Sequence, residues 1–313
     1  MLKKSYLITG GAGFIGSAIA RALVSEGQQV RVIDNLASGN LANLAEVAGQ
    51  IELIEASILD AAALAAAVQG VEVVYHEAAI PSVPRSVAAP LPSHEANATG
   101  TLAVLDAARL AGVRRVVYAG SSSAYGETPT LPKIETMPPS PLSPYAASKL
   151  AGEQYCKVYH HVYGLETVVL RYFNVFGPRQ DPNSQYAAVI PKFVTAALRG
   201  ESPVIYGDGT QSRDFCFIDN VVQANLAAAG APGASGGVFN IACGEAIDLN
   251  GVVREIGTLL GKPVTAQYSD KRSGDIKHSL ASITAAQTVL GYTGTISFAE
   301  GLRRTIAWYR ANA

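Results

Sequence analysis

The chain is poor in cysteine, methionine, tryptophan and charged residues. Its 313 residues include three cysteines, two methionines and one tryptophan, and only 16% are charged. Cys156, Cys216 and Cys243 are odd in number and far apart, so they predict neither a disulfide framework nor a metal site. With a formal net charge of -1, the chain has no basic excess to hold nucleic acid. No apolar run of about 18 residues occurs, so we expect no membrane span and a cytoplasmic protein.

What the sequence does contain is an alternation of short apolar runs with longer helical patterns. Six runs rich in β-branched residues are expected strands: 6–9, 29–34, 51–55, 71–78, 115–119 and 167–171. Four segments between them have the apolar spacing of helices: 15–26, 59–69, 97–111 and 144–163. Most of the runs lack a polar face, as expected when helices cover both sides of a parallel sheet. The first half therefore predicts an α/β fold, a Rossmann-type doubly wound parallel sheet.

After residue 174 the pattern changes to turn-forming residues and scattered elements. We expect helices near 219–229, 249–260 and 298–309, and a strand near 238–241. These predict a smaller mixed α/β domain for substrate. The expected division gives residues 1–177 and 215–243 to the Rossmann domain, and 178–214 and 244–313 to the substrate domain.

The first expected strand runs directly into a glycine-rich turn, Gly10-Gly11-Ala12-Gly13-Phe14-Ile15-Gly16. Glycine is needed where the chain turns tightly, where backbone approaches a pyrophosphate and where helix packs on strand. The helix that follows offers free N–H groups to phosphates. Asp34 ends the second expected strand about 20 residues later, as a dinucleotide-binding motif requires. Its carboxylate can accept both ribose hydroxyls, and no nearby arginine follows to pair with a 2′-phosphate, so the sequence predicts NAD.

A tyrosine and a lysine, Tyr145 and Lys149, stand four residues apart and share one face of an expected helix. A free tyrosine has a pKa of about 10, too high for a base at neutral pH. A nearby ammonium favours the phenolate and lowers that pKa. Ser121, Ser122 and Ser123 close an expected strand at the sheet edge where ligands bind. Tyr145, Lys149 and Ser121 are therefore the candidate catalytic residues.

Together these motifs resemble the extended short-chain dehydrogenase/reductases, specifically the UDP-sugar 4-epimerases. The resemblance covers nearly the whole chain and includes His76-Glu77-Ala78-Ala79, Asn97, Leu170-Arg171-Tyr172-Phe173-Asn174, Gly207-Asp208-Gly209, Arg213-Asp214-Phe215, and Arg272 before Gly274-Asp275. It implies that Tyr145 removes the proton of the sugar 4-hydroxyl while C4 gives hydride to NAD. Ser121 would hydrogen-bond the reacting oxygen, and Lys149 would bind the nicotinamide ribose. The hydride would return to the other face of a 4-keto sugar.

The resemblance also implies the contacts of each half of the site. Contacts to NAD would come from Gly10, Gly13, Phe14, Ile15, Gly16, Asp34, Asn35, Ser38, Gly39, Ile58, Ala78, Ala79, Asn97, Tyr145, Lys149 and Tyr172. Contacts to the nucleotide sugar would come from Ser82, Val83, Ser122, Ser123, Asn174, Ala188, Val189, Val204, Tyr206, Arg213, Arg272, Asp275 and Ser279. The chain departs from many relatives at Ser57, where an acidic residue usually contacts the adenine. Many relatives dimerise through a four-helix bundle, so we expect a homodimer through helices 97–111 and 144–163.

Ser279 bears on which sugar is accepted. In the resemblance this position lies against the rotating sugar, and relatives limited to plain hexoses often carry a tyrosine there. A serine leaves room for a 2-acetamido group, which implies interconversion of UDP-GlcNAc and UDP-GalNAc. Turnover of UDP-glucose and UDP-galactose is compatible with the same pocket.

Three other functions fit parts of this pattern. A UDP-uronate 4-epimerase is one, because arginines such as Arg85 could meet a C6 carboxylate. A nucleotide-sugar 4,6-dehydratase or decarboxylase is disfavoured, because Ser122 and Ser123 stand where the dehydratases carry Asp and Glu. A non-catalytic dinucleotide sensor would keep the fold but would need neither Tyr145 nor Lys149.

Overall fold

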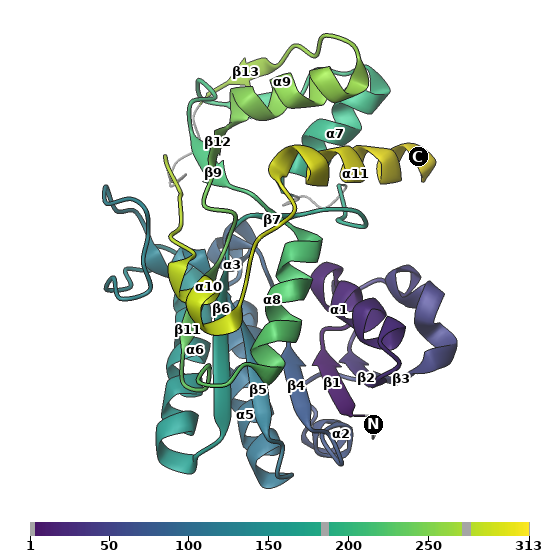
Figure 1. Ribbon diagram of the computed structural model, residues 1–313, viewed down its shortest axis with the longest axis vertical. Helices are drawn as coiled ribbons and strands as arrows, with labels where there is room; N and C mark the ends of the chain where they lie inside the picture. Colours follow the sequence, from purple (N-terminus) through teal and green to yellow (C-terminus); the bar gives the residue numbers. More distant parts are fainter. Residues whose placement is uncertain (1–3, 183–187, 271–276, 313) are drawn as a thin grey trace.

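A seven-stranded sheet forms the centre of the computed structural model, which describes residues 4–182, 188–270 and 277–312 (Figure 1). Its strands, in spatial order, are β11 (Val238–Ile241), β6 (Glu166–Tyr172), β5 (Arg115–Ser121), β4 (Val73–His76), β1 (Ser5–Thr9), β2 (Gln29–Asp34) and β3 (Ile51–Glu55). Every neighbouring pair is parallel. The predicted doubly wound α/β fold is confirmed. The strand order reverses between β1 and β4, which is where such sheets bind ligands.

Helices cover both faces of this sheet (Figure 1). One face carries α1 (Phe14–Ser25), α8 (Ile218–Gly230) and α10 (Thr284–Leu290), and the other carries α2 (Ala61–Ala67), α5 (Gly100–Leu110) and α6 (Pro144–Tyr163). Successive strand residues point to opposite faces. Ile8 therefore joins the core under α1 and α8, while Leu7 joins the core under α5 and α6. Both are fully buried, which is why the strand has no polar face.

A smaller group of helices and short strands lies beyond one end of the sheet (Figure 1). Its helices are α7 (Val189–Arg199), α9 (Leu249–Leu260) and α11 (Phe298–Ala311), packed around Phe193, Ile256 and Leu302. Its short strand pairs are β8 (Val204–Tyr206) with β13 (Gln267–Ser269), β9 (Ser212–Asp214) with β12 (Ala246–Asp248), and β7 (Val175–Phe176) with β10 (Cys216–Phe217). Helix α10 lies in the range 244–313 that was expected to form the substrate domain. It packs instead against strand β11 and against helix α8, which covers the sheet.

Several elements were not anticipated from the sequence. They are η1 (Leu41–Gln50), α3 (Val83–Ala88), α4 (Pro90–His94), a π-helical turn η2 (Glu95–Thr99), η3 (Ser122–Tyr125), α7 and α10. The helix expected over 97–111 begins earlier, because α4 and η2 run directly into α5. Pro90 stands in the first turn of α4, where a missing N–H costs nothing. No helix in the described part of the chain is long and apolar enough to cross a bilayer.

A buried ion pair fixes α6 on the sheet. The Arg171 guanidinium on β6 donates to both carboxylate oxygens of Glu153 on α6, at 2.8 and 2.7 Å, and both side chains are 2% exposed. Burial alone would raise the pKa of Glu153, but hydrogen bonds from Arg171 and Lys157 hold it below its usual value. The Ser143 hydroxyl caps the start of α6 by accepting from the Ala146 N–H at 3.1 Å. The first turns of α6 are therefore held at a set position over the sheet edge.

Candidate active site

The glycine-rich turn connects β1 to α1 at the point where the strand order reverses. Gly10 has φ +68°, and a Cβ there would lie 2.7 Å from the backbone of Ala78. A Cβ on Gly16 would overlap the carbonyl oxygen of Gly10. Gly13 is the N-cap of helix α1 and supplies no side-chain cap, and the first turn of the helix has no acidic residue. Its first N–H groups are therefore suited to a pyrophosphate.

Asp34 is held against this turn by backbone N–H groups. Its Oδ2 accepts from the Ala12 N–H at 2.9 Å and its Oδ1 from the Leu36 N–H at 2.8 Å. A Cβ on Gly39 would lie 2.9 Å from Oδ1, so glycine leaves space beside the carboxylate. Each oxygen keeps a further lone pair for a ribose hydroxyl. The turn, the uncapped helix and this carboxylate together fit a dinucleotide.

The other predicted NAD contacts lie along the same edge of the sheet. Asn35, Ser38 and Gly39 follow β2, Ile58 follows β3, Ala78 and Ala79 follow β4, and Tyr172 ends β6. Asn97 is fully buried, and its amide is already used within the protein. Its Oδ1 accepts from the Ile80 N–H at 2.7 Å, and its Nδ2 donates to the Ser148 hydroxyl at 3.1 Å. Asn97 thus fixes the segment after β4 through a hydrogen bond with its backbone.

Two of the three candidate catalytic residues meet at the start of α6, and the third, Lys149, lies one turn further along the helix. Tyr145 and Lys149 occupy its first two turns, and Ser121 ends β5. Burial raises the pKa of Tyr145, and a hydrogen bond with the Ser121 hydroxyl acts in the opposite direction. Ser121 also shares a 2.7 Å hydrogen bond with the Ser123 hydroxyl. The Tyr145 phenol and the hydroxyl of Ser121 therefore meet at one point.

Lys149 is buried, and its pKa is lower than that of an exposed lysine. It is 3% exposed, and its ammonium lies 4.5 Å from the centre of the Tyr118 ring. Burial lowers its pKa to about 8, against the opposing effect of Glu77. His76 stands nearby between the hydroxyls of Thr9 and Thr101, at 2.7 and 3.0 Å. Burial and the charge of Lys149 lower the pKa of His76 to about 3, so it is neutral at physiological pH.

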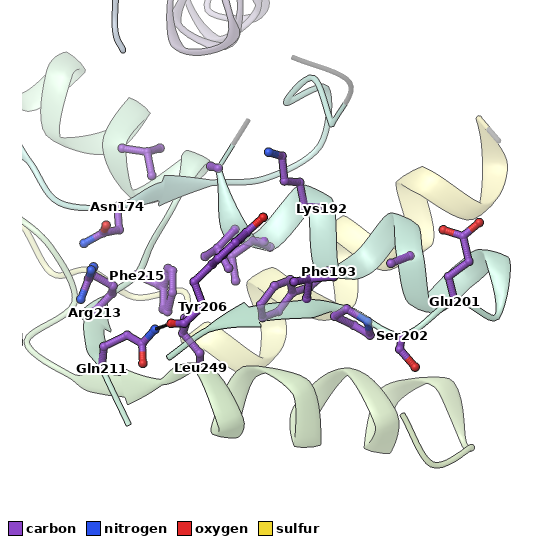
Figure 2. Close-up of a pocket in the computed structure, with 17 residues that line it drawn as sticks. Asn174, Lys192, Phe193, Glu201, Ser202, Tyr206, Gln211, Arg213, Phe215 and Leu249 are labelled. Carbon is purple, nitrogen blue, oxygen red and sulfur yellow. Dashed lines mark hydrogen bonds between the residues drawn. The ribbon is translucent and has the colours of Figure 1, made fainter. Parts of the chain in front are cut away.

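A cavity of about 560 Å³ opens beside the second group of elements (Figure 2). Six predicted substrate contacts line it: Asn174, Ala188, Val189, Val204, Tyr206 and Arg213. Figure 2 shows Asn174 and Arg213 close together at one end, with Glu201 and Ser202 at the opposite end. Tyr206 thus contributes an aromatic ring, and Arg213 a cation, to the lining of one cavity.

Sequence reasoning missed polar residues of this cavity. Gln211 supports its wall, since its Nε2 donates to the Tyr206 carbonyl at 2.7 Å. Lys192 lines the cavity from α7. Neither residue stands in a motif, so only the spatial arrangement reveals them.

The remaining predicted substrate contacts are spread over three places. Ser82 and Val83 cap and begin α3, and Ser122 and Ser123 form η3 beside Ser121. Ser279 is 6% exposed, and its N–H donates to the Ser212 carbonyl at 3.1 Å, next to Arg213. Arg272 and Asp275 lie outside the described residues.

Comparison with known proteins agrees with this geometry. Residues 6–242 match a family model described as the NAD dependent epimerase/dehydratase family. The chain belongs to this family. A protein of Mycolicibacterium smegmatis named UDP-glucose 4-epimerase is 40% identical to this chain, over 97% of this chain and 98% of its own.

Solved structures are similar over the full length. A UDP-N-acetylglucosamine 4-epimerase from Methanobrevibacter ruminantium, in complex with UDP-N-acetylmuramic acid, is 42% identical with a TM-score of 0.95 over 100% of both chains. A UDP-glucuronic acid 4-epimerase from Bacillus cereus, in complex with UDP-glucuronic acid and NAD, is 32% identical with a TM-score of 0.91 over 99% of this chain and 100% of its own. Members of the family that resemble this chain thus differ in the sugar they are named for.

The placement of Asp34 generates a test of cofactor choice. NADH should bind at least about tenfold more tightly than NADPH, a difference of roughly 1.4 kcal/mol, because the carboxylate repels a 2′-phosphate. Fluorescence titration of the ligand-free protein with each nucleotide measures this. The variant Asp34→Ser should narrow the difference, and tighter binding of NADPH by the wild type would contradict the assignment.

Proposed function

We propose that this protein is an NAD-dependent UDP-hexose 4-epimerase that interconverts UDP-N-acetylglucosamine and UDP-N-acetylgalactosamine, and that it also turns over UDP-glucose and UDP-galactose. The observation that carries the proposal is that Tyr145 shares a hydrogen bond with Ser121 at the start of α6, one turn before the buried Lys149, in a chain that also has a dinucleotide-type glycine turn and a cavity lined by an arginine and a tyrosine. The names of the similar proteins support it, since they include epimerases for plain and acetamido UDP-sugars.

The chemistry needs a group that takes a proton and gives it back. Tyr145, as phenolate, removes the proton of the sugar 4-hydroxyl and returns it after the sugar has turned. The Ser121 hydroxyl donates to the reacting oxygen, and the Lys149 ammonium favours the phenolate through its charge. NAD, when bound, would supply a reversible acceptor for the hydride of C4. Because the same electrons return, no outside oxidant is required.

The nucleotide end needs groups that hold a diphosphate and a base. In this proposal Arg213 and Asn174 bind the diphosphate, Tyr206 stacks on the uracil, and Arg272 and Asp275 complete the site. A guanidinium fork suits phosphate oxygens and stays charged at any relevant pH. Residues 1–177 and 215–243 would hold the dinucleotide, and 178–214 and 244–313 the nucleotide sugar. Helix α10 is the exception, because it packs on the sheet.

Two observations count against the uronate epimerase and the dehydratase as alternative functions. Arg85, the arginine considered for a uronate carboxylate, is exposed at the start of α3. Ser122 and Ser123 carry no acid for eliminating water. UDP-glucuronate nevertheless belongs in any substrate panel, because one similar structure contains it. The cytoplasmic location expected from the sequence stays a prediction.

Removing the phenol tests the mechanism. Tyr145→Phe should lower the turnover of UDP-N-acetylglucosamine by at least about 100-fold, the usual scale of general acid–base catalysis. Separation of the epimers after incubation without added reductant measures it. Substrate deuterated at C4 should keep its label in the product. Native speed of the variant, or loss of deuterium to the solvent, would contradict the mechanism.

Enlarging the residue at position 279 tests the sugar class. Ser279→Tyr should slow the acetamido sugars at least about tenfold more than UDP-glucose, because the ring would fill the space left for the acetamido group. Ser279→Ala is the matched control and should slow neither class. Parallel kcat/KM measurements on both classes check this. An equal loss on both would rule out this pocket assignment.

We also propose a homodimer through α5 and α6. On α6, Val158 and Val162 are exposed apolar residues one turn apart, and Leu110 ends the adjacent α5 with 71% exposure. Sedimentation equilibrium should give twice the chain mass, and the double variant Val158→Asp with Val162→Asp should give a monomer. Leu53→Asp, an exposed apolar position on β3, is the control. A wild-type monomer at micromolar concentration would refute the dimer.

A further inference from the structure

A buried tyrosine ends the short helical turn that begins at Ser121, and the proposed mechanism does not use it. Ser121 is the N-cap of η3, and Tyr125 is the last of its four residues. The Tyr125 side chain is 2% exposed, and its hydroxyl donates to the Oδ1 of Asn240 on β11 at 2.7 Å. The guanidinium carbon of Arg171 lies 4.6 Å from the centre of the Tyr125 ring. Because η3 is a single turn, whatever fixes Tyr125 also fixes the position of Ser121.

The amide of Asn240 joins this tyrosine to two other segments of the chain. Its Nδ2 donates to the carbonyl oxygen of Lys133 at 3.0 Å and to that of Ser282 at 3.2 Å. Both partners are carbonyl oxygens, which can only accept, so the orientation of the amide is determined and its Oδ1 is left for the Tyr125 hydroxyl. Asn240 is fully buried, so a lost partner would leave a polar group without a hydrogen bond.

Lys133 connects the same segments through both its backbone and its side chain. Its N–H donates to the carbonyl of Leu280 at 2.8 Å, and its own carbonyl accepts from the N–H of Ser282 at 2.9 Å. Its ammonium is 1% exposed and donates to the carbonyl of Gly126, directly after η3, at 3.0 Å. We call this connection the η3 bridge, and it consists of three residues: Tyr125, Asn240 and Lys133.

The segment 279–282, which the η3 bridge binds on one side, is bound to β9 on the other. The N–H of Ser279 donates to the carbonyl of Ser212 at 3.1 Å, and the N–H two residues later donates to the Asp214 carboxylate at 3.2 Å. Between these two residues of β9 stands Arg213, which lines the cavity proposed for the nucleotide. A series of hydrogen bonds therefore runs from the wall of the cavity, through this segment, to the end of η3.

We propose that Tyr125 and Asn240 are positioning residues, which hold the segment containing Ser279 at a set distance from Ser121 and so determine the room available to the sugar. The inference rests on the proposed function for the placing of the sugar against these two serines. Tyr125 and Asn240 act without touching the substrate, because both side chains are buried and bonded to each other. The segment can move away from η3 only by leaving buried polar groups unpaired, which is costly. A bulky group at position 279 is therefore not relieved by a shift of the segment.

Hydrogen exchange followed by mass spectrometry tests the η3 bridge without any substrate. Tyr125→Phe keeps the ring that packs on Arg171 and removes only the hydroxyl that Asn240 accepts from. Peptides that contain the amides of residues 133 and 279–282 should exchange at least about tenfold faster in this variant, because the connection between them opens more often. Peptides of β1 and β2 should keep their native rates. Unchanged exchange at 279–282 in a folded Tyr125→Phe protein would overturn the inference.

Tyr159→Phe is the matched control. Tyr159 is 6% exposed near the C-terminal end of α6, and its hydroxyl donates to the carboxylate of Asp106 on α5 at 3.3 Å. This variant also loses one hydrogen bond of a buried phenol, but away from η3. It should leave exchange at residues 133 and 279–282 unchanged. Faster exchange at 279–282 in both variants would mean a general loosening of the fold, and would overturn the role given to the η3 bridge.

A double-mutant cycle tests what the η3 bridge does for the sugar. Ser279→Tyr is expected to slow UDP-N-acetylglucosamine more than UDP-glucose. Adding Tyr125→Phe lets the segment yield, so kcat/KM of the double variant for UDP-N-acetylglucosamine should be at least about threefold higher than the product of the two single effects. The same cycle with Tyr159→Phe should be multiplicative. Multiplicative effects with Tyr125→Phe would overturn the inference, because a merely structural loss does not compensate a bulky residue at position 279.

The two experiments separate this inference from the proposed function. Absence of epimerisation in the wild type refutes the proposed function, whereas faster exchange in Tyr125→Phe still supports the hydrogen-bonded connection, because exchange needs no turnover. Native epimerisation with unchanged exchange, or with multiplicative effects, refutes the role of Tyr125 and Asn240 instead. If Ser279→Tyr slows both sugar classes equally, the sugar does not lie against residue 279, and the role proposed for the η3 bridge is overturned as well.

Discussion

The position of α6 on the sheet depends on one buried ion pair. Arg171 and Glu153 join β6 to α6 in a two-point hydrogen-bonded contact, and neither side chain reaches solvent. Breaking such a pair leaves an uncompensated buried charge and costs roughly 3–5 kcal/mol. The pair lies one turn beyond Lys149, so it also determines where Tyr145 meets Ser121 at the end of β5. The relative positions of Tyr145 and Ser121 therefore depend on a contact that takes no part in the proposed chemistry.

The scarcity of charge in this chain has a consequence at the sheet edge. Lys149, Glu77 and Tyr145 are all removed from water, and burial acts against the ionised form of each. Two of them interact as opposite charges, so each makes the ionisation of the other less costly. Their protonation states then respond to a charge introduced nearby far more than surface groups would, because little solvent screens them.

Much of the sheet could be predicted because its signal is local. The strands at 29–34 and 51–55 lie where the apolar and β-branched runs placed them, although β2 is largely buried and the edge strand β3 has no buried residue. Helix α7 was missed although its buried residues Ile190, Phe193, Val194 and Ala197 recur at helical spacing. Glu77 stands in a motif of the resemblance but could be given no role from the sequence, because its environment is made by Tyr172 and Asn225 from distant elements. Motif residues could be named in advance, but the partners that surround them could not.

An epimerase must hold one end of its substrate firmly and leave the other free to turn. Here the polar groups proposed for the reacting carbon stand on strand and helix ends that are fixed by hydrogen bonds, such as Ser143 at the start of α6. The groups proposed for the nucleotide line a cavity between α7 and β8. The proposed sugar-contacting residue Ser279 is a small side chain whose backbone N–H donates to the carbonyl of Ser212, next to Arg213 of the cavity. Exchanging a residue at such a place alters the room for the sugar while leaving the proton-transfer geometry intact.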